Sequence, residues 1–166
     1  MSLFVVFSSL KSSLNMKKFI LSLFFAAAAL SVVAQSNKEV KWEFTATKLS
    51  DKTYEVKITA KINGDWHLYA QNVGVEGPVP TTFSFTKNPL LALDGKVKEV
   101  GKVIKKNEEV WGGVVNYYEK SVEFVQVVKV KGSAKTNLAG KIEFMVCNDE
   151  KCLPPAAVPF SINIGG

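Results

Sequence analysis

The sequence predicts an all-β sandwich, and two observations support this prediction. Apolar and polar residues alternate with a period of two along most of the chain after residue 35, which is typical of strands with one buried face. Turn-forming residues recur about every ten residues, and no segment after residue 35 has a helical period with caps. About seven to eight short strands of this kind indicate an immunoglobulin-like sandwich, with a small closed barrel as the alternative.

The strands are expected in the following order along the chain. Residues 40–46 and 54–62 each alternate between apolar and polar side chains, and a turn at 50–52 joins them. Asn63-Gly64 ends the second strand, and an aromatic stretch and a Gly/Pro loop follow it. Further strands are expected at 82–86, 96–104, 121–130, 141–147 and 158–164.

The first 34 residues have the parts of a secretory signal peptide. Met16-Lys17-Lys18 gives a basic start, residues 19–34 carry no charge, and Ala34 suits the end of a cleavage site. This apolar run is shorter than the about 20 residues of a membrane-spanning helix, so a cleaved signal is favoured over an anchor. We therefore expect a signal peptide at 1–34, with 1–15 as a candidate misplaced start, and one exported domain at 35–166.

Composition excludes several classes of function. The chain has 166 residues and a formal net charge of +6, and all 21 of its basic residues are Lys. Because Arg is the residue best shaped to contact phosphate and guanine, its absence argues against a nucleic-acid partner. One His and two Cys cannot supply the usual four ligands of a Cys/His zinc site. We expect no metal and no cofactor.

Chemistry is expected at the two cysteines, Cys147 and Cys152. Four residues separate them, which suits the end of a hairpin and permits a disulfide between facing positions. A structural disulfide is common in exported proteins, but a loop this short gives only about 2 kcal/mol on the chain-entropy model. A short disulfide in an exposed loop is also the kind that exchanges readily. On this evidence, structural and redox roles both remain open.

The cysteine segment resembles a known family. Residues 147–155, Cys-Asn-Asp-Glu-Lys-Cys-Leu-Pro-Pro, are similar to the active-site segment of the N-terminal periplasmic domain of the DsbD thiol:disulfide interchange proteins. Residues 64–69, 77–83 and 117–121 resemble other parts of that domain, and the similarity covers about residues 38–164. The resemblance implies an immunoglobulin-like sandwich whose two cysteines cycle between disulfide and dithiol.

The resemblance also implies roles for individual residues. Cys152 would form the mixed disulfide with a partner, and Cys147 would resolve it. Tyr117 or Tyr118 would cap the pair, with Tyr117 the first choice. The family's capping segment has acidic residues just before its aromatic residue, whereas this chain has Val115-Asn116 there, and four residues rather than five separate the cysteines.

Three further residues are candidates for the environment of the pair. Lys151 beside Cys152 would favour a thiolate. His67 could carry protons, although a single His in an aromatic strand is more often structural. Tyr69 is equally consistent with packing alone, and 111–113, Trp-Gly-Gly, is interpreted as a mobile loop beside the cap.

The sequence therefore supports a first hypothesis and an alternative. The first is a periplasmic thiol:disulfide oxidoreductase of the protein-disulfide reductase type, which relays electrons to or from thioredoxin-fold proteins. Its membrane electron donor would act in trans, because no further domain follows residue 166 in this sequence. The alternative is a non-catalytic immunoglobulin-like interaction module of the cell envelope with a structural disulfide.

Overall fold

The computed structural model describes residues 38–133 and 135–165, which form eleven strands and one short 3₁₀ turn. The expected signal peptide lies outside these residues. No helix within the described ranges is long and apolar enough to cross a membrane. The elements are β1 (Val40–Ser50), β2 (Thr53–Ile62), β3 (His67–Tyr69), β4 (Thr82–Phe85), β5 (Leu91–Val100), β6 (Ile104–Glu108), η2 (Glu109–Trp111), β7 (Gly113–Glu119), β8 (Ser121–Val130), β9 (Thr136–Phe144), β10 (Val146–Cys147) and β11 (Ala156–Ile164).

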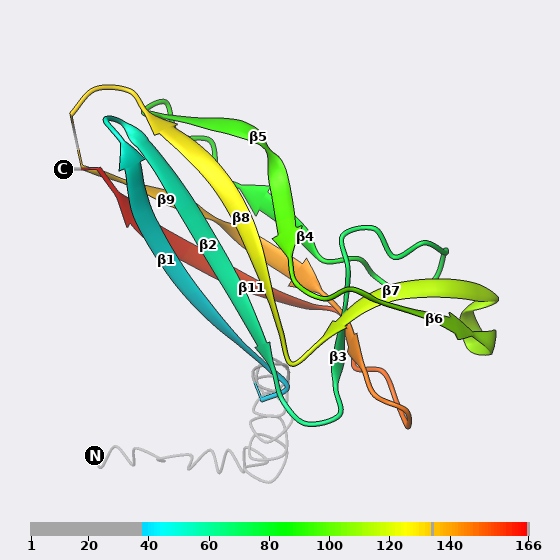
Figure 1. Cartoon of the computed structure of the whole chain (residues 1–166). Helices are drawn as coiled ribbons and strands as arrows, with labels where there is room; N and C mark the ends of the chain where they lie inside the picture. Colours follow the sequence, from blue (N-terminus) through cyan, green and yellow to red (C-terminus); the bar gives the residue numbers. More distant parts are fainter. Residues whose placement is uncertain (1–37, 134, 166) are drawn as a thin grey trace, which may run out of the picture. The chain divides into compact units, whose positions relative to one another are not determined.

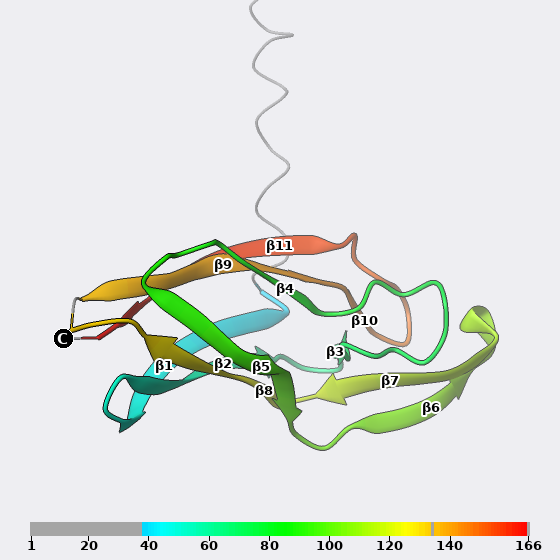
Figure 2. The same cartoon turned by 90° about the horizontal axis from the view of Figure 1, so that it is seen from above.

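The strands form three antiparallel sheets, with the orders β1-β2-β8-β5, β11-β9-β4 and β10-β3-β7-β6. Figure 1 shows the first two sheets running side by side along the molecule, and Figure 2 shows them as two facing layers. The third sheet extends from one end of this sandwich, where the β6–β7 hairpin projects furthest. The prediction of an all-β sandwich is confirmed.

The core lies between the two facing layers and is rich in aromatic side chains. Phe124 on β8 is fully buried, and its ring centroid lies 6.0 Å from that of Trp42 on β1 and 4.9 Å from that of Phe83 on β4. Trp42 also reaches Phe144 of the opposite layer at 5.2 Å. The alternating apolar residues of β2 and β8 therefore fill the space between the sheets, as their period of two predicts.

Two parts of the chain differ from the expected strand pattern. The segment expected at 96–104 is divided between β5, which begins at Leu91, and β6, which belongs to another sheet. No strand was expected at β7, which buries Val115 and Tyr117 on one face and Tyr118 on the other. The exposed Val114 shares a face with the buried Tyr118, so apolar side chains lie on both faces of β7 and its sequence lacks the alternation of a half-buried strand.

Replacing the central aromatic residue of the core should destabilise the whole domain. We expect Phe124→Ala to lower the free energy of unfolding by about 3–5 kcal/mol, because it leaves a cavity between the two layers. Urea unfolding followed by tryptophan fluorescence measures this change. The control is Leu49→Ala, at a side chain that is 55% exposed, which should change stability by no more than about 0.5 kcal/mol. Equal losses in the two variants would contradict this description of the core.

Candidate functional site

In the third sheet, β3 lies between β10 and β7, and its pairing with β10 positions Cys147. On one side His67 lies opposite Cys147 of β10, and on the other it lies opposite Glu119 of β7. Tyr69 is opposite Tyr117 in the same ladder. Directly opposed residues in an antiparallel pair share one face of the sheet, so these five side chains project on the same side.

The two faces of β3 contact different groups of residues. Leu68 points toward the sandwich, where it joins Val146 and Tyr118 in the main core. On the opposite face Tyr69 and Tyr117 form a second, smaller buried cluster with Cys147. We call this the site cluster; its other members are Val73 and Val115, with Val75, Ile104, Trp111 and Met145 packed against it.

The structure separates the two tyrosines that were expected to cap the cysteines. Tyr117 lies in the site cluster beside Cys147, whereas Tyr118 is directed into the main core. Burial, together with the neighbouring Glu99 carboxylate, raises the pKa of Tyr118 to about 12. Adjacent residues of a strand face opposite ways, so only one of the two can reach the cysteines.

Cys147 and Cys152 form a disulfide at the end of a tight hairpin. They are antiparallel bridge partners with Cα atoms 4.0 Å apart, as the four-residue spacing predicted. The Leu153 N–H donates to the Val146 carbonyl at 3.0 Å, and the Asn148 N–H donates to the Lys151 carbonyl at 2.9 Å. These backbone bonds hold the hairpin on both sides of the S–S bond.

The side chain of Asn148 closes the tip of this hairpin. Its Oδ1 accepts hydrogen bonds from the N–H groups of Glu150 at 3.1 Å and Lys151 at 2.8 Å. Asn favours turns because its short side chain can satisfy backbone donors two or three residues further along. These hydrogen bonds therefore hold the loop in addition to the disulfide.

The two sulfur-bearing residues differ in their exposure. Cys147 is only 2% exposed, while Cys152 is an exposed residue. A partner protein can therefore approach Cys152 from solvent, but Cys147 is covered by the site cluster.

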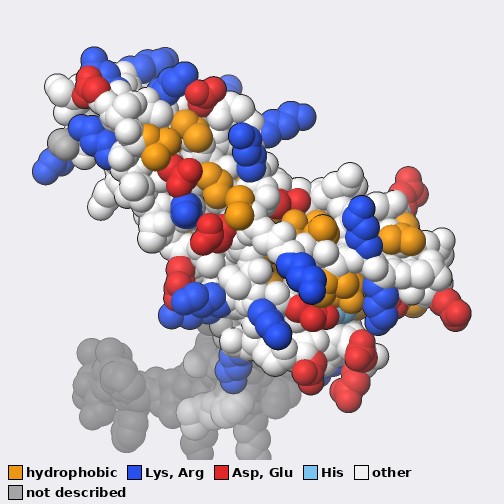
Figure 3. Space-filling model, in the orientation of Figure 1, with side chains coloured by type: hydrophobic (Ala, Val, Ile, Leu, Met, Phe, Trp, Pro, Cys, Tyr) orange, Lys and Arg blue, Asp and Glu red, His pale blue; other side chains and the backbone are white. Residues whose placement is uncertain are grey.

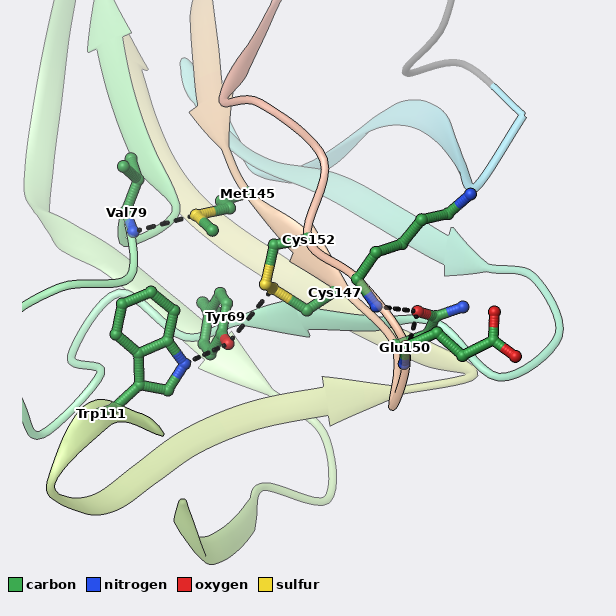
Figure 4. Close-up of a disulfide and its surroundings, with 9 residues drawn as sticks. Tyr69, Val79, Trp111, Met145, Cys147, Glu150 and Cys152 are labelled. Carbon is green, nitrogen blue, oxygen red and sulfur yellow. Dashed lines mark hydrogen bonds between the residues drawn. A yellow bond between two sulfur atoms is a disulfide. The ribbon is translucent and has the colours of Figure 1, made fainter. Parts of the chain in front are cut away.

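A chain of hydrogen bonds leads from an indole to the buried sulfur. The Trp111 Nε1–H donates to the Tyr69 hydroxyl at 3.2 Å, and that hydroxyl donates to the Cys147 Sγ at 3.4 Å. Figure 4 shows the Tyr69 hydroxyl lying between the indole and the disulfide. Burial raises the pKa of Tyr69, although the bond from Trp111 opposes this shift, so the phenol keeps the proton that it donates.

The His67 ring is packed between the two tyrosines of the site. Its centroid lies 4.3 Å from that of Tyr117 and 5.3 Å from that of Tyr69, to which it is nearly perpendicular. Partial burial lowers the pKa of His67, against the raising effect of Glu108, Glu119 and Asp149. The neutral imidazole is therefore favoured near neutral pH.

Charged residues border the hairpin. Lys106 of β6 lies 2.9 Å from the Glu108 carboxylate and 3.8 Å from that of Asp149, which bridges β6 to the cysteine loop. This pairing raises the pKa of Lys106. Because the Lys106 and Asp149 side chains are exposed and Glu108 is only partly buried, each ion pair contributes little to stability.

The disulfide lies at an open pocket on the surface. The structure brings His67, Tyr69 and Lys151 to this pocket together with both cysteines, as expected for the environment of the pair. Among the described residues, no three His, Cys, Asp or Glu side chains are arranged to hold a metal ion. The pocket is lined by His67, Tyr69, Lys106, Glu108, Val110, Trp111 and residues 147–152.

Residues 34–163 match the family model of the N-terminal domain of the thiol:disulfide interchange protein DsbD. The chain belongs to this family. No curated protein sequence matches the chain.

Three solved structures are similar to this chain. The reduced DsbD N-terminal domain of Neisseria meningitidis is 18% identical with a TM-score of 0.53, over 78% of this chain and 89% of that one. The N-terminal periplasmic domain of ScsB from Proteus mirabilis is 18% identical with a TM-score of 0.53, over 81% of this chain and 49% of that one. A complex between the DsbD and PilB N-terminal domains of Neisseria meningitidis is 13% identical with a TM-score of 0.46, over 76% and 84%. The two structures at 0.53 show that the fold is that of a DsbD N-terminal domain.

Trp111, which the sequence analysis interpreted only as part of a mobile loop beside the cap, is hydrogen-bonded to Tyr69 and lines the pocket. It ends η2 at the tip of the β6–β7 hairpin, and Gly112 follows in a left-handed conformation at φ 70°. A side chain at Gly77 would overlap the indole, so the Gly/Pro loop packs directly against Trp111. One signal was available: the acidic pair Glu108-Glu109 comes just before this aromatic residue, as acidic residues do in the family's capping segment.

Removing the Tyr69 hydroxyl should raise the thiol pKa of Cys147. In a Cys152→Ala background, we expect Tyr69→Phe to raise this pKa by about one unit, because a hydrogen bond to a charged group is worth about 1.5–3 kcal/mol. The ultraviolet absorbance of the thiolate, followed against pH, measures it. Tyr117→Phe is the matched control, since no hydrogen bond joins Tyr117 to the sulfur, and it should leave the pKa unchanged. Identical titrations of the two variants would contradict the role of the Tyr69 bond.

Proposed function

We propose that this chain is a thiol:disulfide oxidoreductase that relays two electrons through Cys147 and Cys152. The observation that carries the proposal is the pairing of an exposed Cys152 with a buried Cys147 at the end of a hairpin. One sulfur is open to a partner protein, and the other is placed to complete the exchange. Membership of the thiol:disulfide interchange family supports this reading.

The exchange proceeds in two steps from the reduced protein. The Cys152 thiolate attacks one sulfur of a partner's disulfide, and the other partner sulfur leaves as a thiolate that takes up a proton. The Cys147 thiolate then attacks the Cys152 Sγ, the mixed disulfide breaks, and the second partner sulfur leaves and is protonated. The partner gains two electrons and two protons, and this chain is left with the Cys147–Cys152 disulfide.

The hairpin can hold its shape in both redox states. Closing so short a loop with a disulfide contributes about 2 kcal/mol on the chain-entropy model. The Val146–Leu153 and Asn148–Lys151 backbone bonds and the bonds of the Asn148 side chain do not involve the sulfur atoms, and we expect them to persist when the S–S bond is broken. A relay needs this property, because a domain that unfolded on reduction could not transfer electrons repeatedly.

Aromatic side chains shield the buried sulfur in this proposal. Tyr117 packs beside Cys147, and Trp111 covers the pocket from the β6–β7 hairpin. Val110 at the tip of that hairpin is 79% exposed, and Figure 3 shows apolar side chains at the surface of this end of the molecule. This apolar end gives a partner a surface to contact beside Cys152.

The partners and the compartment follow from the family. We assign thioredoxin-fold proteins as exchange partners, with a membrane electron donor acting in trans. The periplasm is the proposed location, reached through the signal peptide expected at 1–34. The similar ScsB domain is described as periplasmic, which supports this location.

Trapping experiments test the proposal and the roles of the two cysteines. The partner is a thioredoxin-fold protein in which the second cysteine of the Cys-x-x-Cys motif is replaced by Ser and the first carries a thionitrobenzoate leaving group, so that neither protein can resolve the mixed disulfide. It is mixed with each reduced single-cysteine variant. We expect Cys147→Ser to accumulate a covalent complex through Cys152, because the resolving thiol is absent. Cys152→Ser should form little complex, since its remaining thiol is buried. Non-reducing electrophoresis and mass spectrometry measure both products.

Two results would count against the proposal. A complex formed by Cys152→Ser and not by Cys147→Ser would reverse the assignment of roles. The absence of a complex with either variant would contradict electron relay and would favour an interaction module with a structural disulfide.

A further inference from the structure

The resolving step requires a base beside Cys147. Its thiol must lose a proton before it can attack the Cys152 sulfur, because the thiolate is the nucleophile. Cys147 is 2% exposed, and burial away from water raises the pKa of a thiol. Bulk solvent is therefore poorly placed to take this proton.

His67 is positioned next to this thiol by strand pairing. It lies directly opposite Cys147 in the β3–β10 ladder, and such partners have Cβ atoms about 4.5–5.5 Å apart on the same face. The ring is held by Tyr117 and Tyr69 and lines the same pocket as both cysteines. Strand pairing therefore places the imidazole on the same face of the sheet and in the same pocket as the Cys147 side chain.

The other polar groups around the pocket are less suited to this task. Tyr69 already donates its own proton to the sulfur. Glu108 is paired with Lys106, and the Asp149 side chain is 92% exposed in solvent. Carboxylates are also weak bases for a thiol, since proton transfer is most efficient when the pKa of the base lies near the working pH.

We propose that His67 is the base that accepts the proton of the Cys147 thiol while Cys147 resolves the mixed disulfide. The imidazole takes the proton, and the thiolate attacks the Cys152 Sγ. The S–S bond to the partner then breaks, and the leaving partner thiolate takes a proton from the imidazolium. His67 returns to its neutral form, so the cycle balances without any further reactant. This inference rests on the proposed relay function.

Charges from every neighbouring element bear on the ionisation of His67. Glu119 of β7 and Glu108 of β6 favour the imidazolium, as does Asp149 of the cysteine loop, while Lys106 of β6 opposes it. Desolvation is the largest influence and lowers the pKa of His67. The ring is therefore free to accept a proton at neutral pH. The remaining charged or titratable groups that line the pocket or stack on the ring are Tyr69, Tyr117, Glu150 and Lys151.

A pH-jump experiment isolates the resolving step. Cys152 of the full chain is loaded with glutathione in acid, using a pyridyl disulfide of glutathione, and mass spectrometry verifies the single adduct. The solution is then brought to a series of pH values, and release of glutathione by Cys147 is followed. In the wild type, the rate of glutathione release should rise with pH through the pKa of His67 and then level off. It should rise again only when the Cys147 thiol itself ionises.

His67→Phe keeps an aromatic ring against Tyr117 but cannot accept a proton. We expect it to lower the rate of release near neutral pH by roughly a hundredfold, the lower end of general acid–base effects. Its rate should rise tenfold per pH unit up to the thiol pKa, where it meets the wild-type rate. His67→Gln keeps a polar side chain and should show the same loss of rate near neutral pH. It replaces His67→Phe in the experiment if that variant does not fold.

The wild type alone also tests the proposal. His67 is the single histidine of the sequence, so its imidazole resonances can be assigned without variants. The pKa obtained by titrating them in the glutathione adduct should equal the lower pKa of the rate profile. A mismatch, an unchanged profile in both variants, or a uniform rate loss at every pH would overturn the role of His67. Failure of the wild type to release glutathione at any pH would instead overturn the relay function itself.

Discussion

The site depends on the three-residue strand β3, which pairs with β10 on one side and with β7 on the other. This double ladder places Cys147 opposite His67 and places Tyr117 opposite Tyr69. A strand alternates its faces, so the same pairing that buries Leu68 in the sandwich brings the other side chains to the disulfide. A slip of one residue in either ladder would exchange the two faces and dismantle the site.

The residues that hold the two large sheets together and the residues around Cys147 form two different buried clusters. The sandwich core around Phe124 and Trp42 holds the two large sheets together and extends to Val146, next to Cys147 in the chain. The site cluster is smaller and lies on the sheet that extends from one end of the sandwich. The disulfide contributes about 2 kcal/mol on the chain-entropy model, which is comparable to a few net hydrogen bonds of the kind that hold the same hairpin. Breaking it therefore need not disturb the core.

The sequence predicted the parts of this arrangement that are local. The alternation along β2 and β8 indicates buried faces, and the spacing of Cys147 and Cys152 indicates a hairpin end; both agree with the structure. The resemblance pointed to the cysteines and to an aromatic cap. It gave Tyr117 as the first choice for the cap but left Tyr118 open, because the facing of neighbouring residues depends on the register with β3.

Long-range contacts account for part of what the sequence could not predict. Trp111 is brought to Tyr69 by the fold of the β6–β7 hairpin, and its position also depends on Gly77 in a distant loop. The acidic pair Glu108-Glu109 before Trp111 is a local signal, but it does not indicate the contact with Tyr69. For Trp111 the missing information lies in pairing between segments far apart in the chain. The strand β7 was missed for another reason: apolar residues on both of its faces, including the exposed Val114, obscure the period of two.

The reduction potential of the Cys147–Cys152 bond tests the central claim most directly. The protein is equilibrated with glutathione or thioredoxin redox buffers, and the fraction of disulfide and the circular dichroism are measured together. A relay predicts a potential well above about −300 mV, the region of resistant structural disulfides, and a fold that persists on reduction. A potential below about −300 mV, or loss of the fold when the bond is reduced, would contradict the account and identify the disulfide as structural.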